Sequence, residues 1–150
     1  MVQPGQRLIV FDAFSLRGLA LNDGKLFPDE MSAFRLAFRG RRFRMLVTDG
    51  ILREYTAEST NRPQFLPVPT LTRLSDLGRA IFRDESQLDR SPVDLPGLPR
   101  EHRSFVMDAI ASRASYFITN YQRWLGLTNR TETTFGLSIV TPARFVELEG

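Results

Sequence analysis

The sequence has no cysteine, one histidine and one lysine, and it has no long apolar run. The absence of cysteine excludes disulfides and thiolate metal sites. No Ser-His-Asp or cysteine-based catalytic motif is present. No apolar stretch approaches the roughly 20 residues of a membrane span. Residues 1–7 lack the cationic start and apolar segment of a secretory signal. These absences predict a cytoplasmic protein with no membrane partner.

The remaining composition is that of a globular protein. The chain has 150 residues, of which 42% are hydrophobic and 25% are charged. This size and balance predict one domain, residues 1–150, with a real core. The net charge is +3, and every basic residue except Lys25 is arginine. Arginine suits bidentate phosphate contacts, although a genomic codon bias also produces it. The charge permits a nucleic-acid partner without requiring one.

Strand-like and helix-like segments alternate along the chain. This alternation predicts an α/β fold with a twisted, mainly parallel sheet and helices on both faces. Strands are expected at 8–12, 44–47, 116–119 and 136–140, with a short edge strand at 93–95. Helices are expected at 29–39, 49–59, 71–83, 100–113, 122–125 and from 142 onward, with Thr48, Thr70 and Thr141 as caps.

Two acids follow strand-like runs. Asp12 ends the apolar run 8–11, and Glu54 lies on the helix that follows the second strand. The carboxyl ends of parallel strands meet at one sheet edge, where α/β proteins often hold a divalent metal. Asp12 can instead cap the following turn. Glu54 can instead be a solvated helix residue.

Four strings, in their order along nearly the whole chain, resemble a PIN domain. They are LIVFDAF at 8–14, ILREY at 51–55, ASYFITNY at 114–121 and IVTPARF at 139–145. Within that superfamily the chain resembles the VapC-like ribonuclease toxins of toxin–antitoxin systems. The resemblance implies a PIN-like fold and an endoribonuclease that uses Mg²⁺ or Mn²⁺ held by three or four acids. Such a cation neutralises phosphate oxygens and activates the attacking water. The resemblance also implies RNA, an antitoxin or other protein, or a second copy of the chain as partners.

The acid positions of the family carry over only in part. Asp12 and Glu54 match the first two acids. The third position falls on His102, beside Glu101, and the fourth falls on Tyr121. Imidazole and phenol cannot act as anionic ligands, so two of four acids are kept. We therefore expect weak or absent hydrolysis and an RNA- or protein-binding role.

The alternative is an active metal-dependent endoribonuclease toxin. It requires Glu101 or Asp108 to compensate for the missing acids, although Asp108 also fits an ordinary surface acid. Thr119 and Asn120, just before Tyr121, can position a phosphate or water, or can simply end a strand.

Two further side chains have alternative roles. His102 can ligate a softer metal or simply be exposed. Tyr121 can stack a base or fill the pocket.

The densest basic feature is the run 39–44. Its residues Arg41, Arg42 and Arg44 are candidates for contacts with an RNA backbone. A solvated cationic helix end, favoured by the helix dipole, is the alternative.

Overall fold

The core of the fold is a five-stranded sheet in which all pairings are parallel. The computed structural model describes residues 6–16, 27–61, 67–89, 97–100 and 102–150. The strand order across the sheet is β3-β2-β1-β4-β5, so the expected α/β parallel sheet is confirmed. The strands are β1 (Arg7–Phe11), β2 (Phe43–Thr48), β3 (Ala80–Arg83), β4 (Tyr116–Ile118) and β5 (Ser138–Val140).

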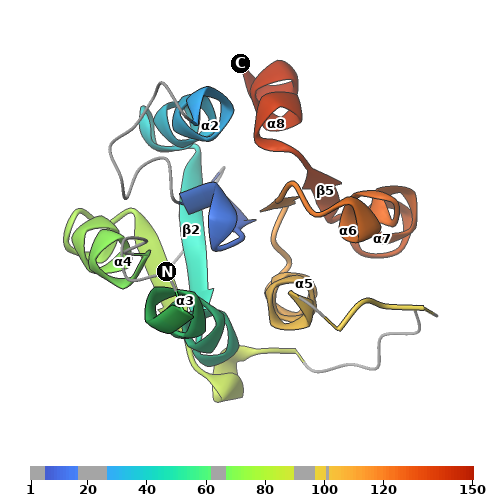
Figure 1. Ribbon diagram of the computed structural model, residues 1–150, viewed down its shortest axis with the longest axis horizontal. Coiled ribbons are helices and arrows are strands. Elements are labelled where there is room, and N and C mark those ends of the chain that lie inside the picture. The colour runs from blue at the N-terminus through green and yellow to red at the C-terminus, as the bar shows by residue number, and fades with distance from the viewer. Residues whose placement is uncertain (1–5, 17–26, 62–66, 90–96, 101) are drawn as a thin grey trace.

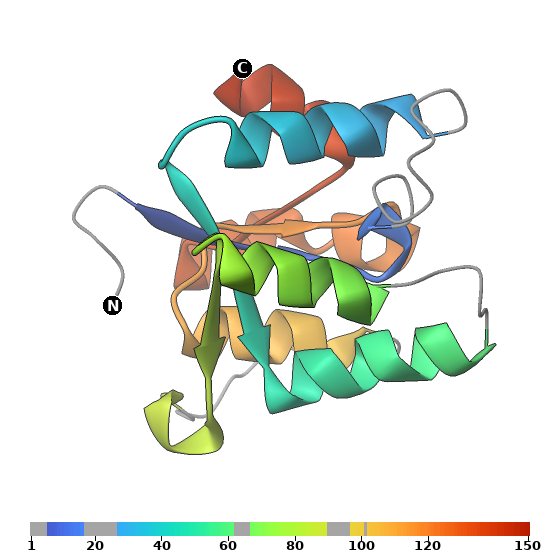
Figure 2. The same cartoon turned by 90° about the vertical axis from the view of Figure 1, so that its left-hand side faces the viewer.

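Helices cover both faces of this sheet (Figures 1 and 2). Helices α2 and α8 pack together on one face, and α3 and α5 lie on the other, with α4 alongside α3. Helices α6 and α7 lie beside β5. The helices are α2 (Pro28–Phe38), α3 (Asp49–Asn61), α4 (Pro67–Asp76), α5 (Arg103–Ala111), α6 (Gln122–Leu125), α7 (Thr128–Phe135) and α8 (Pro142–Glu149), with 3-10 turns η1 (Phe14–Leu16) and η2 (Glu85–Gln87).

The central strands are buried on both faces because helices cover both. In β1, four of five residues are buried, and all of β4 is buried. Such strands read as continuous apolar runs rather than as alternating patterns. Phe105 of α5 stacks on Phe117 of β4 with ring centroids 5.7 Å apart. Trp124 of α6 is fully buried, as are both phenylalanines.

Two expected helix caps are confirmed. Thr48 Oγ1 accepts a hydrogen bond from Ile51 N at 3.1 Å, at the start of α3. Thr141 Oγ1 accepts one from Arg144 N at 3.1 Å, and Pro142 takes the first position of α8. Each threonine satisfies one of the amide groups that a helix start leaves without a partner.

The expected helix at 71–83, with Thr70 as its cap, is wrong at both ends. Helix α4 begins at Pro67, so Thr70 lies inside the helix. Helix α4 ends at Asp76, and Ala80–Arg83 form the edge strand β3. Gly78 has φ of +70°, a conformation that ends helices and that glycine adopts without strain. Arg79 N then closes the helix end on Leu74 O at 2.8 Å. The apolar residues Ile81 and Phe82 of β3 continue the helical spacing of Leu71 and Leu74, so the sequence pattern favours one longer helix.

The remaining differences from the expected elements concern α7 and residues 93–95. Helix α7 was not expected, because its sequence, TNRTETTF, has little apolar periodicity. The expected edge strand at 93–95 lies outside the described residues. None of the helices in the described part of the chain has both the length and the hydrophobicity that a membrane span requires.

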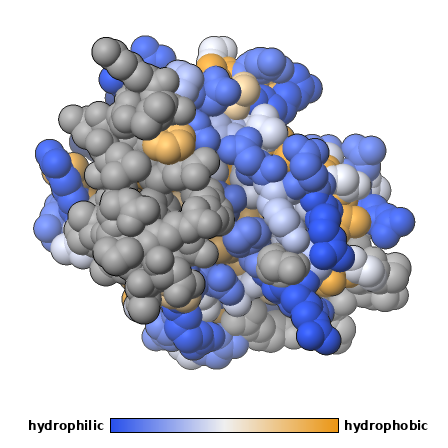
Figure 3. Space-filling model, viewed as in Figure 1, coloured by the Kyte–Doolittle hydropathy of each residue, from blue (hydrophilic) through white to orange (hydrophobic). Residues whose placement is uncertain are grey.

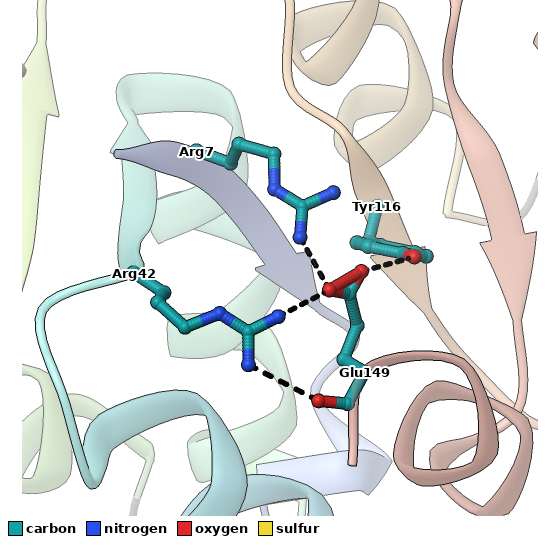
Figure 4. Close-up of polar contacts among 4 residues, drawn as sticks. All are labelled: Arg7, Arg42, Tyr116 and Glu149. Carbon is teal, nitrogen blue, oxygen red and sulfur yellow. Dashed lines mark hydrogen bonds and ion pairs between the residues drawn. The ribbon is translucent and has the colours of Figure 1, made fainter. Parts of the chain in front are cut away.

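Helix α8 is tied to the beginning of the sheet by Glu149 (Figure 4). Arg7 and Arg42 both form ion pairs with Glu149 Oε1, the second at 2.5 Å, and Tyr116 donates to Oε2 at 2.7 Å. Arg42 also donates to the Glu149 carbonyl at 3.1 Å. This single carboxylate therefore links the helix to β1, β4 and the residue before β2.

This cluster shifts two pKa values. Burial by itself would raise the pKa of Glu149, but hydrogen bonds from Tyr116 and Arg7 and the charges of Arg7 and Arg42 outweigh it and lower the pKa. Burial, followed by the hydrogen bond to Glu149, raises the pKa of Tyr116 to about 12. The folded state therefore favours an ionised Glu149 beside a neutral Tyr116.

We expect Glu149→Gln to lower the free energy of unfolding by about 1–3 kcal/mol at pH 7, because the Glu149 side chain is only 9% exposed and holds charged partners. A lowered folded pKa means that this contribution is present above the ordinary value of 4.5 and is lost as the pH falls below it. Urea unfolding of both proteins from pH 7 to pH 3 measures the difference, which should shrink at acid pH. The control is Glu147→Gln, whose exposed pair with Arg144 should contribute less than about 1 kcal/mol. Equal losses of unfolding free energy for the two variants would mean that Glu149 does not stabilise the fold through its buried contacts.

Candidate functional site

The candidate site lies at the carboxyl edge of the sheet, between β1 and β4. Strand β1 pairs with β2 on one side and with β4 on the other, so the chain order reverses at β1. In open parallel sheets the crevice outside such a reversal point is the usual ligand position. Asp12 directly follows β1, and Thr119 directly follows β4. The topology therefore brings these two expected site residues together.

Asp12 is buried, and each of its carboxylate oxygens accepts a hydrogen bond from the protein. It is 1% exposed. Its Oδ1 accepts from Ser15 N at 2.7 Å, and its Oδ2 accepts from the Thr119 hydroxyl. The first bond caps the turn η1, which is the alternative that the sequence left open for Asp12. The second joins the ends of β1 and β4. Thr119 Oγ1 in turn accepts from Tyr121 N at 3.1 Å.

Helix α3 reaches the same edge through Tyr55. The Tyr55 hydroxyl donates to the carbonyl of Phe11, the last residue of β1. Burial raises the pKa of Tyr55 well above its usual value, and the charge of Asp12 raises it further, so Tyr55 stays a neutral donor. Its neighbour Glu54 is half-buried. Glu54 therefore lies on the helix that contacts the end of β1, directly before Tyr55, whose side chain makes that contact.

His102 and Tyr121, which the PIN resemblance aligns with the third and fourth acids, contact each other. Their rings meet edge to face with centroids 5.1 Å apart, and His102 also packs against Phe105 at 5.7 Å. His102 precedes α5 with φ of +64°, and its Nδ1 is shielded from solvent without a hydrogen-bond partner. Both residues are half-buried. An aromatic pair therefore occupies the positions at which the PIN pattern expects carboxylates.

Asn120 leads to an acid that sequence reasoning missed. Its Nδ2 donates to Glu30 Oε1 at 3.3 Å, and Glu30 is only 7% exposed. Glu30 lies in the first turn of α2, where an acid also suits the helix dipole. The position of Glu30 at the start of the helix after the first strand was a usable signal, because such a helix begins near the carboxyl edge of a parallel sheet. Ser15, which binds Asp12, was missed as well.

Asp108 is not the surface acid that its position suggested. It is 3% exposed, and its Oδ2 accepts from the Thr48 hydroxyl at the carboxyl end of β2. A Cβ atom added to Gly50 would lie 2.8 Å from Asp108 Oδ2, so glycine is required for this approach. The expectation of an exposed Asp108 was wrong, because α5 turns this face toward α3 instead of toward solvent.

The described residues do not fit a hard divalent cation. Nowhere in the described part of the chain do three or more histidine, aspartate or glutamate side chains come together in a way that could hold a metal ion. Mg²⁺ and Mn²⁺ are bound by oxygens, usually including several waters. Both Asp12 oxygens already accept from the protein in a buried position. Glu101, the expected substitute acid, lies outside the described residues.

The expected RNA-contacting arginines lie at the opposite edge of the sheet. Arg41 and Arg42 directly precede β2 and are exposed, with Arg42 paired to Glu149. Arg44, inside β2, is half-buried. The sequence predicts one basic surface for the three arginines, but only Arg41 and Arg42 are exposed, because Arg44 lies within the sheet.

Comparisons with known proteins assign no family and no function to this chain. A scan against protein-family models finds no match to this chain, and searches of curated proteins and of solved structures find no similar protein.

Proposed function

We propose that this protein is a PIN-like domain that has lost efficient hydrolysis and acts as an RNA-binding module in the cytoplasm. The observation that carries the proposal is the state of Asp12, the first acid of the family pattern. Its carboxylate is buried and bound through both oxygens by Ser15 and Thr119. It works there as a junction between β1, the following turn and β4.

The surrounding positions support the same conclusion. His102 and Tyr121 stand where the family has its third and fourth acids, and their rings pack together. A cation brought to this edge would meet an imidazole and a phenol in place of two negative charges. Because clustered carboxylates provide most of the attraction for Mg²⁺ or Mn²⁺, losing half of them weakens binding directly.

RNA is the ligand that the exposed charge favours. Arg41 and Arg42 are exposed at the amino edge, and guanidinium groups bind phosphate oxygens in a bidentate manner. Apolar side chains appear only as separate small spots among hydrophilic ones on the face shown in Figure 3. The residues that Figure 3 colours by hydropathy form no extended apolar surface on that face. An antitoxin or a second copy of the chain as a partner therefore stays a prediction.

Incubating RNA with the protein over a range of Mn²⁺ concentrations tests the loss of hydrolysis. We expect no more cleavage by the wild type than by Asp12→Asn, and equal RNA affinity for the two proteins, because Asp12 is buried away from the ligand. Fluorescence anisotropy with a labelled RNA measures the affinity, and gel analysis of the same samples measures cleavage. Manganese-dependent cleavage by the wild type that Asp12→Asn abolishes would overturn the proposal.

One observation favours the alternative, an active metal-dependent endoribonuclease. Glu30 adds a buried carboxylate at the carboxyl edge, held by Asn120. The alternative also requires Glu54 to approach Asp12 and Glu30, because among the described residues no three acids are grouped closely enough to hold a metal ion. Under this reading Glu30→Gln would remove cleavage as completely as Asp12→Asn does, whereas under the proposal neither variant changes the reaction.

A further inference from the structure

Arginines gather at the amino edge of the sheet, away from Asp12. Arg7 is the first residue of β1, three more arginines lie in the segment between α2 and β2, and another directly precedes β3. Because β3, β2 and β1 are neighbours in the sheet, these residues form a row across its edge. We call them the amino-edge arginine cluster: Arg7, Arg39, Arg41, Arg42 and Arg79.

Hydrogen bonds to backbone carbonyls hold the cluster together. Arg7 N donates to Arg42 O at 2.9 Å, and Gln6 Nε2 donates to Arg41 O at 2.9 Å. The Arg79 guanidinium donates to Gly40 O. The segment between α2 and β2 is therefore fixed on one side by the start of β1 and on the other by the start of β3. The arginines sit on an anchored surface and not on a free loop.

The cluster is strongly positive. Glu149 is the acid that pairs with it in the described part of the chain, through Arg7 and Arg42. Arg39 and Arg41 are exposed. Two of the five guanidinium groups, those of Arg7 and Arg42, are paired with this carboxylate. The surface keeps a positive excess of several charges.

The buried acids and the arginine cluster lie at different edges of the sheet. The buried acids Asp12, Glu30 and Asp108 belong to the carboxyl edge, whereas the cluster occupies the amino edge. Five residue steps along β1 separate Arg7 from Asp12, or about 17 Å at 3.3 Å per residue. A polyanion attracted to the cluster is therefore held away from the candidate catalytic edge.

Resting on the proposed function, we infer that the amino-edge arginine cluster binds the phosphate backbone of single-stranded RNA. Neighbouring strands lie about 4.8 Å apart, so the row offers closely spaced cations along a line, as a phosphate chain requires. Arg39 also lines a depression of about 610 Å³ between α2 and α8, together with Leu36 and Phe38. This depression gives unpaired bases an apolar surface beside the phosphate contacts. RNA bound in this way is recognised without reaching Asp12.

Titrating a labelled, unstructured RNA of 20 nucleotides at several NaCl concentrations tests the inference. The double variant Arg39→Gln/Arg41→Gln removes two exposed charges without touching the Glu149 pairs. We expect its affinity to fall roughly 10- to 100-fold at 50 mM salt, because each lost phosphate contact removes about 0.7 from the slope of log K against log salt. The slope should therefore fall by about 1.4.

The matched control is Arg53→Gln/Arg103→Gln, which removes two exposed charges from the N-terminal halves of α3 and α5, helices that begin at the carboxyl edge. Its affinity and slope should stay within twofold of the wild type's values. Thermal unfolding of both variants checks that the fold is kept. If the control loses as much affinity as the test variant, or if only the control loses it, the amino edge is not the binding surface, although RNA binding itself stands. If the wild type binds no RNA at low salt, this inference and the RNA ligand of the proposed function both fail.

Discussion

Replacing Asp12 by alanine is expected to lower the free energy of unfolding by about 2–4 kcal/mol, because two buried donors lose their acceptor. Ser15 N and the Thr119 hydroxyl both donate to this carboxylate, and the residue is almost completely buried. The bond from Thr119 joins residues 107 positions apart in the chain. Removing it loosens the contact between β1 and β4 and also the turn after β1. Urea denaturation followed by circular dichroism measures the loss.

Asp12→Asn distinguishes this structural role from a metal-binding role. The amide keeps the volume of the side chain, and its oxygen can still accept from Ser15 N. The Thr119 hydroxyl can rotate to accept from the amide nitrogen, because a hydroxyl both donates and accepts. We therefore expect a loss of only about 1 kcal/mol. If alanine and asparagine are equally mild, Asp12 does not hold the junction together, and its conformation then has to be explained by a ligand.

Replacing Asp108 by alanine is expected to have an effect of similar size, about 2–4 kcal/mol. Asp108 accepts from the hydroxyl of Thr48, which itself caps α3 by accepting from Ile51 N. Losing the carboxylate leaves a buried hydroxyl without its acceptor and weakens the link between α5 and the end of β2. The exposed Asp49, at the start of α3, is the control. Its replacement by alanine should cost less than about 1 kcal/mol, from the helix dipole alone.

A second substitution makes the Asp108 prediction specific. Gly50→Ala should destabilise the wild type by about 1–3 kcal/mol, because the new methyl group would lie 2.8 Å from Asp108 Oδ2. In the Asp108→Ala background the clash is gone, and the higher helix propensity of alanine should make the same change neutral or stabilising. Chemical denaturation of the four proteins gives the coupling energy. Additive effects would mean that Gly50 and Asp108 do not contact each other.

The sequence predicts those residues of the candidate site that directly follow a strand. Asp12 and Thr119 follow apolar runs, and the rule that parallel strands end at one edge placed them together correctly. Glu30 and Asp108 were harder, because both belong to helices whose buried face depends on what packs against it. Asp108 looks like any helix-surface acid until α3 and Thr48 are seen beside it.

The amino-edge arginine cluster could likewise be predicted only in part from the sequence. Arg41 and Arg42 stand out in the sequence as a basic run. Arg7 and Arg79 are isolated residues, 32 or more positions away from the run 39–44, and they join it only because β1 and β3 flank β2. Conversely, Arg44 is part of the run in sequence but is half-buried within β2.

The sequence by itself determined the α/β class, the parallel sheet, most helix boundaries and the position of Asp12 at a strand end. It could do so because burial on both faces of a parallel strand, helix caps and turn residues leave local signals that span only a few positions. Tertiary structure alone decided which strands are neighbours and therefore which charges meet. It decided that Asp12 accepts a hydrogen bond from Thr119, that His102 meets Tyr121, and that Arg7 and Arg79 join the arginines before β2 at the amino edge. Such pairings depend on the packing of segments distant in the chain, which no local pattern encodes.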